Sequence, residues 1–273
     1  MKRLTLTLVA ALILATVGCY TNPVTGRKSL VLISPDQEVN LGAQSFGEIR
    51  QTEKVSTDAA ANARVQRVGQ RIARAVGDQM PNAKWEFVVF DSPDLNAFAL
   101  PGGKVGVYTG LLRLAASDDE LAIVMGHEIG HVVARHGAER MSEAMLIAGL
   151  GVIGTAVVDH NASPQTRNLF LLAYGGATTV GRILPQSRKN ESESDYMGLQ
   201  FAATAGYDPR ASIRFWEKMN AQEKASNVPA WLSTHPAGPQ RLAELQDLAP
   251  RFVPLYEANR TQTSVDANRV IGR

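Results

Sequence analysis

The sequence predicts an α+β fold that is mainly helical, in which one buried helix packs against a small β-sheet with an edge strand. The chain has 273 residues, 45% of them hydrophobic, which is enough to form one sizeable core. Helix-capping patterns recur, as at Ser34-Pro35-Asp36-Gln37 and Ser117-Asp118-Asp119-Glu120. Alternating apolar residues are concentrated between residues 85 and 109, which limits the sheet to a few short strands.

The first eighteen residues have the organisation of a secretory signal. After two basic residues, residues 4–17 are apolar apart from threonine, and the chain's single cysteine, Cys19, follows Gly18. This pattern resembles a bacterial lipobox, so we expect residues 1–18 to be removed and Cys19 to carry a lipid. The alternative is a buried free thiol beside an uncleaved anchor. Tyr20, in place of the aspartate that retains lipoproteins at a Gram-negative inner membrane, favours the outer membrane.

Two helices are expected before the sheet. Residues 19–33 are rich in turn-forming residues and predict a lipid-anchored tether. Ser34 caps the first helix, and Asp58 opens a second helix that Gly77 ends. We interpret both helices as packing elements.

Three short strands are expected next. Residues 85–90, 96–100 and 104–109 have the required alternating or continuous apolar character. Asp91-Ser92-Pro93 and Pro101-Gly102-Gly103 separate them as turns. A small sheet follows from this spacing.

The capping box at Ser117 predicts a helix that reaches at least Ala134 and is apolar on every side, so it should be buried. Two glycine-rich apolar stretches follow, at 145–158 and 169–184. Each is shorter than the roughly 20 residues that span a bilayer. We expect a helical hairpin or a mobile cover over the functional site, with membrane insertion as the alternative.

The remaining chain predicts two more helices and a tail. Asp208-Pro209 starts a helix to about residue 221, and residues 239–248 form the last one. The polar, aperiodic residues 251–273 predict a flexible tail. One domain over residues 34–250 is therefore expected.

The charge pattern argues against nucleic acid as a partner. The chain has 28 Lys and Arg against 26 Asp and Glu, and removal of the signal leaves 26 of each sign. No block of like charge is long enough to form a nucleic-acid-binding arm.

His127-Glu128-Ile129-Gly130-His131 forms an HExxH motif within the predicted buried helix. Four residues turn a helix by about 400°, so His127 and His131 lie one above the other, as two ligands of one metal must. Glu128 lies about 100° away, in reach of water on the metal. The alternative is a pair of hydrogen-bonded core histidines with an ion-paired glutamate, although burying all three without a metal is costly.

A catalytic zinc needs a third protein ligand and an open position. His136 is rotated about 140° from His131 and is interpreted as structural. If residues 188–195 begin a helix, Glu191 and Asp195 share one side, so Glu191 can bind the metal while Asp195 holds a ligand histidine. Glu193 points elsewhere in this interpretation and is expected to be solvated.

The chain resembles the gluzincin peptidases that include the CAAX prenyl endopeptidase, HtpX and the mitochondrial OMA-type proteases, and it is most similar to their periplasmic lipoprotein members. The resemblance covers about residues 34 to 250. It rests on HExxH and on four further groups of residues: Asn96-Ala97-Phe98-Ala99, Pro101-Gly102-Gly103 with Thr109-Gly110-Leu111-Leu112, Glu191-x-x-x-Asp195 after Ser187-Arg188, and Thr234-His235-Pro236 with Arg241. The chain departs from HtpX and the prenyl endopeptidase in lacking clear multispan membrane segments, which argues against prenylated substrates.

The resemblance implies one zinc ion per chain, held by His127, His131 and Glu191, with Glu128 as the general base. It also implies that His235 lies near the metal, as a transition-state stabiliser or as a reversible fourth ligand. Arg241 is expected to hold that region together.

The function expected is zinc-dependent endopeptidase activity on unfolded or misassembled envelope proteins, at the periplasmic face of the bacterial envelope. An extended substrate is expected to pair with an exposed strand edge at these residues, with Asn96 beside them: Lys104, Val105, Gly106, Val107 and Tyr108. The alternative for that strand is an internal position. The alternative function is a lipid-anchored chaperone or assembly factor whose zinc is structural or gated by His235.

Overall fold

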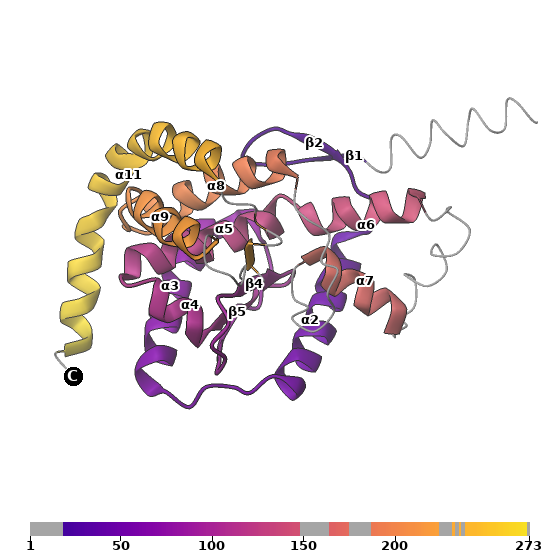
Figure 1. Cartoon of the computed structure of the whole chain (residues 1–273), viewed down its shortest axis with the longest axis horizontal. Helices are drawn as coiled ribbons and strands as arrows, with labels where there is room; N and C mark the ends of the chain where they lie inside the picture. Colours follow the sequence, from indigo (N-terminus) through magenta and orange to yellow (C-terminus); the bar gives the residue numbers. More distant parts are fainter. Residues whose placement is uncertain are drawn as a thin grey trace, which may run out of the picture.

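The computed structural model describes residues 19–147, 164–174, 187–223, 231–232, 235 and 238–271 (Figure 1). Its architecture is α+β and mainly helical, as predicted. The predicted signal, residues 1–18, lies outside the described residues, as do residues 148–158 and 175–184 of the predicted cover. The elements in chain order are β1 (Cys19–Thr21), β2 (Lys28–Leu30), α2 (Pro35–Thr52), α3 (Ala59–Val76), η1 (Gly77–Gln79), β3 (Glu86–Phe90), β4 (Ala97–Leu100), β5 (Lys104–Tyr108), α4 (Thr109–Leu114), α5 (Asp118–Val133), α6 (His136–Ile147), α7 (Pro164–Tyr174), α8 (Arg188–Thr204), α9 (Ala211–Glu223) and α11 (Pro239–Ile271).

The segment predicted to be a lipid-anchored tether, residues 19–33, contains a β-hairpin. Strands β1 and β2 pair antiparallel, with Cys19 opposite Leu30. The Asn22 side chain accepts a hydrogen bond from the Val24 backbone N–H at 2.9 Å, and Gly26 takes the left-handed conformation (φ 72°) that the turn requires. The turn residues of 19–33 therefore build a tight hairpin, which their composition alone did not distinguish from a tether.

Local capping fixes the starts of the first two long helices where the sequence placed them. Ser34 and Gln37 form a reciprocal capping box on α2, and Asp58 accepts from the backbone N–H groups of residues 60 and 61 at the start of α3. The apolar face of α3 is fully buried, and Gly77 ends the helix. Both helices pack against the core, as expected.

The three-stranded sheet has the order β3-β5-β4, so the strand expected at the edge is internal. β5 pairs parallel with β3, Glu86 opposite Lys104, and antiparallel with β4, Ala97 opposite Val107. Both backbone edges of Lys104–Tyr108 are therefore occupied, and this strand cannot add a substrate strand. The edge prediction for Lys104, Val105, Gly106, Val107 and Tyr108 is wrong, because strand order in space is not encoded in the apolar pattern of one strand.

Helix α5 lies at the centre of the molecule and packs along α8 (Figure 1). Its residues from Glu120 to Val133 are buried on all sides. The two helices approach closely where glycines face each other: a Cβ added at Gly126 would lie 2.8 Å from the carbonyl oxygen of Gly198. This contact brings the side chains of α5 and α8 to one point.

The last helix, α11, is longer than the sequence suggested. It spans Pro239–Ile271, although Pro250 and Pro254 lie inside it, and Figure 1 shows it change direction along its length. Phe252 is buried and its ring packs edge-on against Tyr196 of α8, with ring centroids 5.2 Å apart. Residues 251–260, expected to begin a loose tail, are therefore helical and partly packed.

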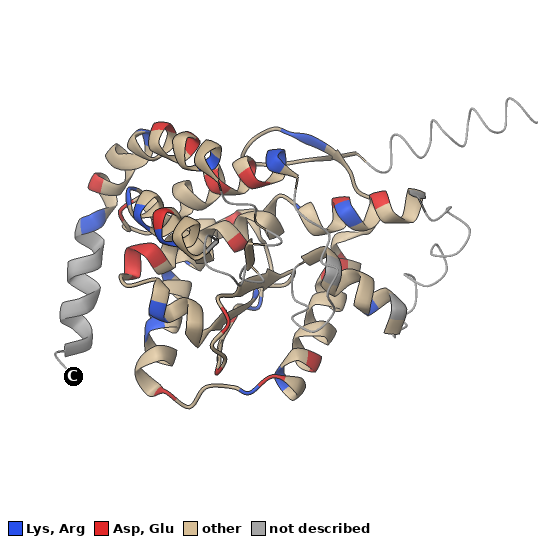
Figure 2. Ribbon diagram, viewed as in Figure 1, with Lys and Arg blue, Asp and Glu red and all other residues tan. Residues whose placement is uncertain are grey.

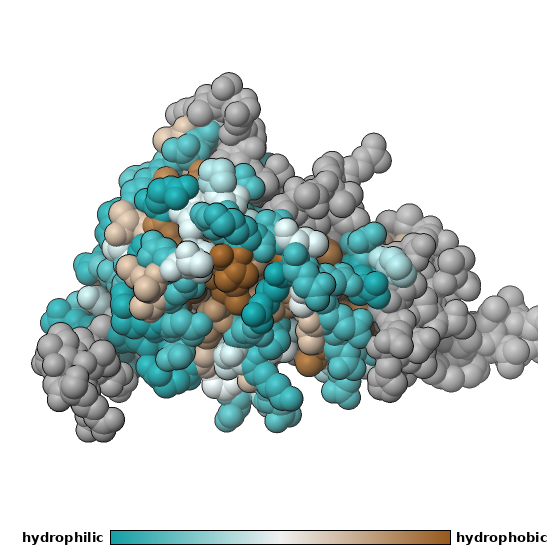
Figure 3. All heavy atoms as spheres, turned by 90° about the horizontal axis from the view of Figure 1, so that it is seen from below, coloured by the Kyte–Doolittle hydropathy of each residue, from teal (hydrophilic) through white to brown (hydrophobic). Residues whose placement is uncertain are grey.

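Positively and negatively charged residues are interspersed along the described elements (Figure 2). Figure 3 shows a hydrophobic patch near the middle of the face seen from below, among mostly hydrophilic residues. Among the described helices, none combines the length and apolar character needed to cross a bilayer.

The pH dependence of stability should reveal how the hairpin is attached. The Tyr20 hydroxyl donates to the Val133 carbonyl oxygen at the end of α5, at 2.6 Å. Burial, partly offset by Arg135, raises the pKa of Tyr20 from 10.0 to about 12. The unfolded phenol ionises near pH 10, so its contribution is complete below about pH 10 and is lost as the pH rises to about 12.

We therefore expect the unfolding free energy of the wild type to fall across this range by about 1 kcal/mol more than that of Tyr20→Phe, allowing for the partial exposure of the ring. Denaturant unfolding of both proteins at several pH values measures the difference. An identical pH dependence would contradict the contact between Tyr20 and α5.

Candidate metal centre

The HExxH motif lies in the buried middle of α5. His127 and His131 project from the same side, with their Nε2 atoms 3.0 Å apart. Their side chains are only 4% and 6% exposed. The helix therefore offers two imidazole nitrogens to one point, as its period requires.

Helix α8 brings Glu191 to the same point. Its Oε1 lies 3.3 Å from His131 Nε2, and its Oε2 lies 3.5 Å from His127 Nε2. Ligands at the usual zinc bond length of about 2.0–2.1 Å stand roughly 3.3 Å apart at the corners of a tetrahedron. Glu191 Oε1 is buried and accepts no hydrogen bond from the described residues. The three ligand atoms thus fit a tetrahedral zinc site.

Asp195 and Arg241 surround this set. Asp195 Oδ1 lies 2.9 Å from His127 Nδ1, the contact that the spacing of α8 predicted. Arg241 of α11 donates to Asp195 and Glu191, at 2.7 Å and 2.5 Å. Burial raises the pKa of Glu191, but the charge of Arg241 and the nearby imidazoles outweigh it and hold that pKa well below its usual range. Glu191 is therefore present as a carboxylate, the form that binds metal.

The Nδ1 side of the His131 ring contacts His136. The two Nδ1 atoms lie 2.8 Å apart, and His136 Nε2 lies 2.9 Å from Glu193 Oε2. Burial lowers the pKa of His136, so the ring is neutral at pH 7. Glu193 is 8% exposed, and the expectation that it is solvated is wrong. The burial of Glu193 could not be predicted from sequence, because its partners at residues 22–27 lie far away along the chain.

Glu128 faces two residues that follow α9 in the chain. The Trp231 indole N–H donates to Glu128 Oε1 at 2.7 Å, and His235 Nε2 lies 3.5 Å from the same oxygen. Burial raises the pKa of Glu128 to about 7, partly offset by His127 and Trp231. A carboxylate with a pKa near neutrality suits proton transfer at physiological pH. The contact from Trp231 was not predicted, because nothing in the sequence near residue 231 forms a motif.

His235 joins the ligand set in space. One atom each from His127, His131, Glu191 and His235 lies within 4.8 Å of the others. The His235 ring stacks on Trp231, with centroids 4.7 Å apart, and burial lowers its pKa to about 3, so the ring is neutral. Its neighbours in the sequence motif, Thr234 and Pro236, lie outside the described residues.

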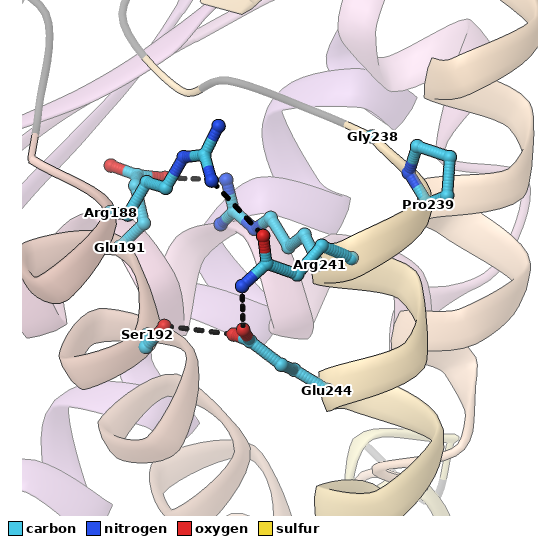
Figure 4. Close-up of a pocket in the computed structure, with 8 residues that line it drawn as sticks. Arg188, Glu191, Ser192, Gly238, Pro239, Arg241 and Glu244 are labelled. Carbon is cyan, nitrogen blue, oxygen red and sulfur yellow. Dashed lines mark hydrogen bonds and ion pairs between the residues drawn. The ribbon is translucent and has the colours of Figure 1, made fainter.

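A cavity of about 190 Å³ lies beside the cluster, where α8 and α11 begin (Figure 4). Glu191 and Arg241 line its inner side. Across its rim, Arg188 donates to Gln240 at 3.1 Å, Gln240 donates to Glu244 at 3.1 Å, and Ser192 donates to Glu244 at 2.9 Å. These bonds tie together the two segments that carry Glu191 and Arg241.

The structure thus brings seven of the predicted site residues together, whereas the predicted substrate strand, β5, is internal to the sheet. Asn96 is buried and precedes β4, and its carbonyl oxygen accepts from the Tyr108 N–H at 3.0 Å. The cluster consists of His127, Glu128, His131, Glu191, Asp195, His235 and Arg241.

Several known proteins with similar sequences are named as metalloendopeptidases or proteases. Mitochondrial metalloendopeptidase OMA1 of Schizosaccharomyces pombe is 38% identical over 187 residues, 68% of this chain and 52% of that protein. The protein of that name in Arabidopsis thaliana is 40% identical over 197 residues, 71% of this chain and 38% of that protein. The β-barrel assembly-enhancing protease of Escherichia coli strain K12 is 30% identical over 281 residues, 99% of this chain and 57% of that protein. This chain spans about half the length of these relatives.

Residues 59–249 match the family described as Peptidase family M48, whose members are zinc metalloproteases. The match includes α5 with its HExxH motif, Glu191 of α8 and Arg241 of α11. The protein therefore belongs to peptidase family M48.

Proposed function

We propose that this protein is a zinc-dependent endopeptidase that hydrolyses unfolded or misassembled proteins of the cell envelope. The observation that carries the proposal is the convergence of His127, His131 and Glu191 beside Glu128. Three ligands with a carboxylate next to them are the arrangement of a catalytic rather than a purely structural zinc site.

The chain's own residues supply the proton transfer. Zinc, when bound, supplies a Lewis acid that polarises a carbonyl group and acidifies water. Glu128 takes a proton from the attacking water and returns it to the leaving amine, which its raised pKa favours. Asp195 keeps His127 in the orientation and tautomer that present Nε2, and Arg241 holds Glu191 and Asp195 in register.

Strand β4 is the better candidate for substrate pairing. It packs against α5 and lies at an edge of the sheet, with β5 as its partner among the described strands. Asn96 immediately precedes it. Pairing through backbone hydrogen bonds requires an extended, unfolded segment of the substrate, and it imposes little preference for particular substrate side chains. The name of the Escherichia coli relative, which refers to β-barrel assembly, supports envelope proteins as substrates.

We place the protein at the periplasmic face of the outer membrane, anchored by a lipid on Cys19. Cys19 is exposed at the start of β1, where a lipid can be attached without disturbing the core.

Removing the metal tests the proposed activity. A chelator is expected to abolish cleavage of an unfolded casein by the purified full chain. Stoichiometric zinc is expected to restore cleavage, because Glu128 is not one of the ligand residues and stays in place when the metal is removed. Metal analysis should find one zinc per chain. Cleavage that survives complete metal removal would contradict a zinc peptidase.

A second candidate function, a chaperone or assembly factor with a gated zinc, is favoured by one observation. His235 occupies the side of the ligand cluster next to Glu128, and all four ligand residues are buried. A fourth protein ligand fills the position that a catalytic zinc keeps open. This arrangement corresponds to a closed site that would hold zinc without cleaving.

His235→Ala separates the two functions. If His235 is a reversible fourth ligand of an enzyme, casein cleavage should rise several-fold with unchanged zinc content. A loss of cleavage would instead assign His235 to transition-state stabilisation. Absence of cleavage in both proteins, with one zinc bound, would favour the chaperone.

A further inference from the structure

A continuous line of hydrogen-bonded polar groups connects the hairpin of β1 and β2 to the predicted zinc ligand His131. Asn22 is 2% exposed, and its amide donates to Glu193 Oε1 at 2.8 Å. The Thr25 hydroxyl donates to the same oxygen, and the Arg27 guanidinium donates to Glu193 Oε2. Arg27 also forms a bidentate pair with Glu139 of α6, at 2.8 Å for each bond. Glu193 thus has three of its partners on the hairpin.

The direction of the hydrogen bonds follows from the metal chemistry. A neutral imidazole that binds a metal through Nε2 carries its proton on Nδ1. His131 therefore donates from Nδ1 to His136 Nδ1, and His136 in turn donates from Nε2 to Glu193. Glu193, as a carboxylate, accepts this bond together with those from the hairpin. Each donor in the line meets an acceptor, so one tautomer of each ring satisfies the whole network.

Without the hairpin, Glu193 would lose three of the donors that compensate its burial. A buried carboxylate is tolerated only when hydrogen bonds or charges replace its hydration. Glu193 would then turn toward solvent, and His136 would lose the acceptor that orients its ring. His131 would keep its place on α5 but not the partner that fixes its rotation.

We propose that the N-terminal hairpin is a working part of the metal centre, in which Asn22, Thr25 and Arg27 act as positioning residues for the zinc ligand His131. Their effect passes through Glu193 and His136. The proposal rests on the zinc site of the proposed function but not on cleavage, so metal binding alone can test it.

The decisive variants keep the shape of the network and change its donors. Asn22→Asp keeps the oxygen that accepts from the Val24 and Thr25 backbone N–H groups, so the turn can still form. It replaces the amide donor with a second carboxylate facing Glu193. Glu193→Gln removes the charge with the same side-chain shape. Loss of a residue that orients a metal ligand lowers metal affinity by about 10- to 100-fold.

We expect both variants to bind zinc 10- to 100-fold more weakly than the wild type, in competition with a chromophoric chelator. We also expect the visible absorption of Co²⁺ bound to the full chain to shift, because a rotated His131 changes the geometry of the ligand field. Thr25→Val, which removes one hydroxyl at nearly constant shape, should give a smaller effect of the same kind and serves if the other variants fold poorly.

Tyr20→Phe is the matched control. It removes a hydrogen bond between the same hairpin and α5 without touching Glu193. Its zinc affinity and Co²⁺ spectrum should equal those of the wild type even if its melting temperature falls as much as that of Asn22→Asp. Wild-type affinity and an unshifted spectrum in Asn22→Asp and Glu193→Gln would overturn the proposal. A wild-type chain that binds no stoichiometric zinc would instead contradict the proposed function itself.

Discussion

Glu128→Gln is expected to abolish peptide hydrolysis while the protein keeps its zinc. Glutamine has the same shape and can still accept the bond from Trp231, but its amide does not take a proton from water. Glu128 is not one of the four residues of the ligand cluster, so metal content should be unchanged. Removal of a general base lowers rates by about 10²- to 10⁴-fold. Casein cleavage and metal analysis on the same preparation measure both effects.

Glu120→Gln is the matched control for this change. Glu120 lies on the same helix, is 3% exposed, and binds Lys218 at 2.8 Å instead of facing the ligands. The control should keep its cleavage rate and lose only stability. Retained cleavage by Glu128→Gln would show that Glu128 is not the base, and loss of zinc would show that it helps to hold the metal.

Gly198→Ala is expected to separate the two halves of the metal site. A Cβ at residue 198 would lie 2.8 Å from the backbone nitrogen of His127 and 3.0 Å from its Cα. Backbone atoms in the middle of a buried helix cannot move aside, so α8 must shift away from α5. Glu191 lies on α8, and His131 and His127 lie on α5. The shift therefore lengthens the distances from the Glu191 carboxylate to the Nε2 atoms of these two histidines, which are 3.3 and 3.5 Å.

We expect Gly198→Ala to lose at least about ten-fold in zinc affinity, since changes that misplace a ligand have effects of this size. Overpacking should lower the unfolding free energy by about 1–3 kcal/mol as well. Chelator competition and denaturant unfolding measure the two losses. Gly47→Ala provides the control, because no atom lies within 4 Å of its added Cβ. The unfolding free energy of Gly47→Ala, a variant in α2, should rise by up to about 1 kcal/mol, and its zinc affinity should equal that of the wild type. Wild-type zinc affinity in Gly198→Ala would contradict the role of this helix contact.

The parts of the structure that the sequence predicted are those set by local interactions. Ser34 and Asp58 cap their helices as expected because an N-cap depends on residues two or three positions away. The spacing of Glu191 and Asp195 placed both on one side of α8 for the same reason.

The parts that it missed depend on neighbours far apart in the chain. The internal position of β5 follows from how β4 folds back beside it, which the pattern of a single strand does not reveal. Glu193 is charged and lies two residues from the predicted ligand Glu191, and its burial is explained by partners on the hairpin together with His136 of α6. Trp231 contacts Glu128 from a segment without any motif.

The position of Cys19 in β1 would limit how the protein moves relative to a bilayer if Cys19 carries the proposed lipid. Three residues after Cys19, Asn22 is already buried against the catalytic domain. Three extended residues reach only about 10 Å. If Cys19 carries the proposed lipid, the connection between the bilayer and the folded domain is therefore short, and the domain would stay in the layer of solvent next to the lipid headgroups. Proposed substrates would then have to come to that surface, so the anchor would select them by location.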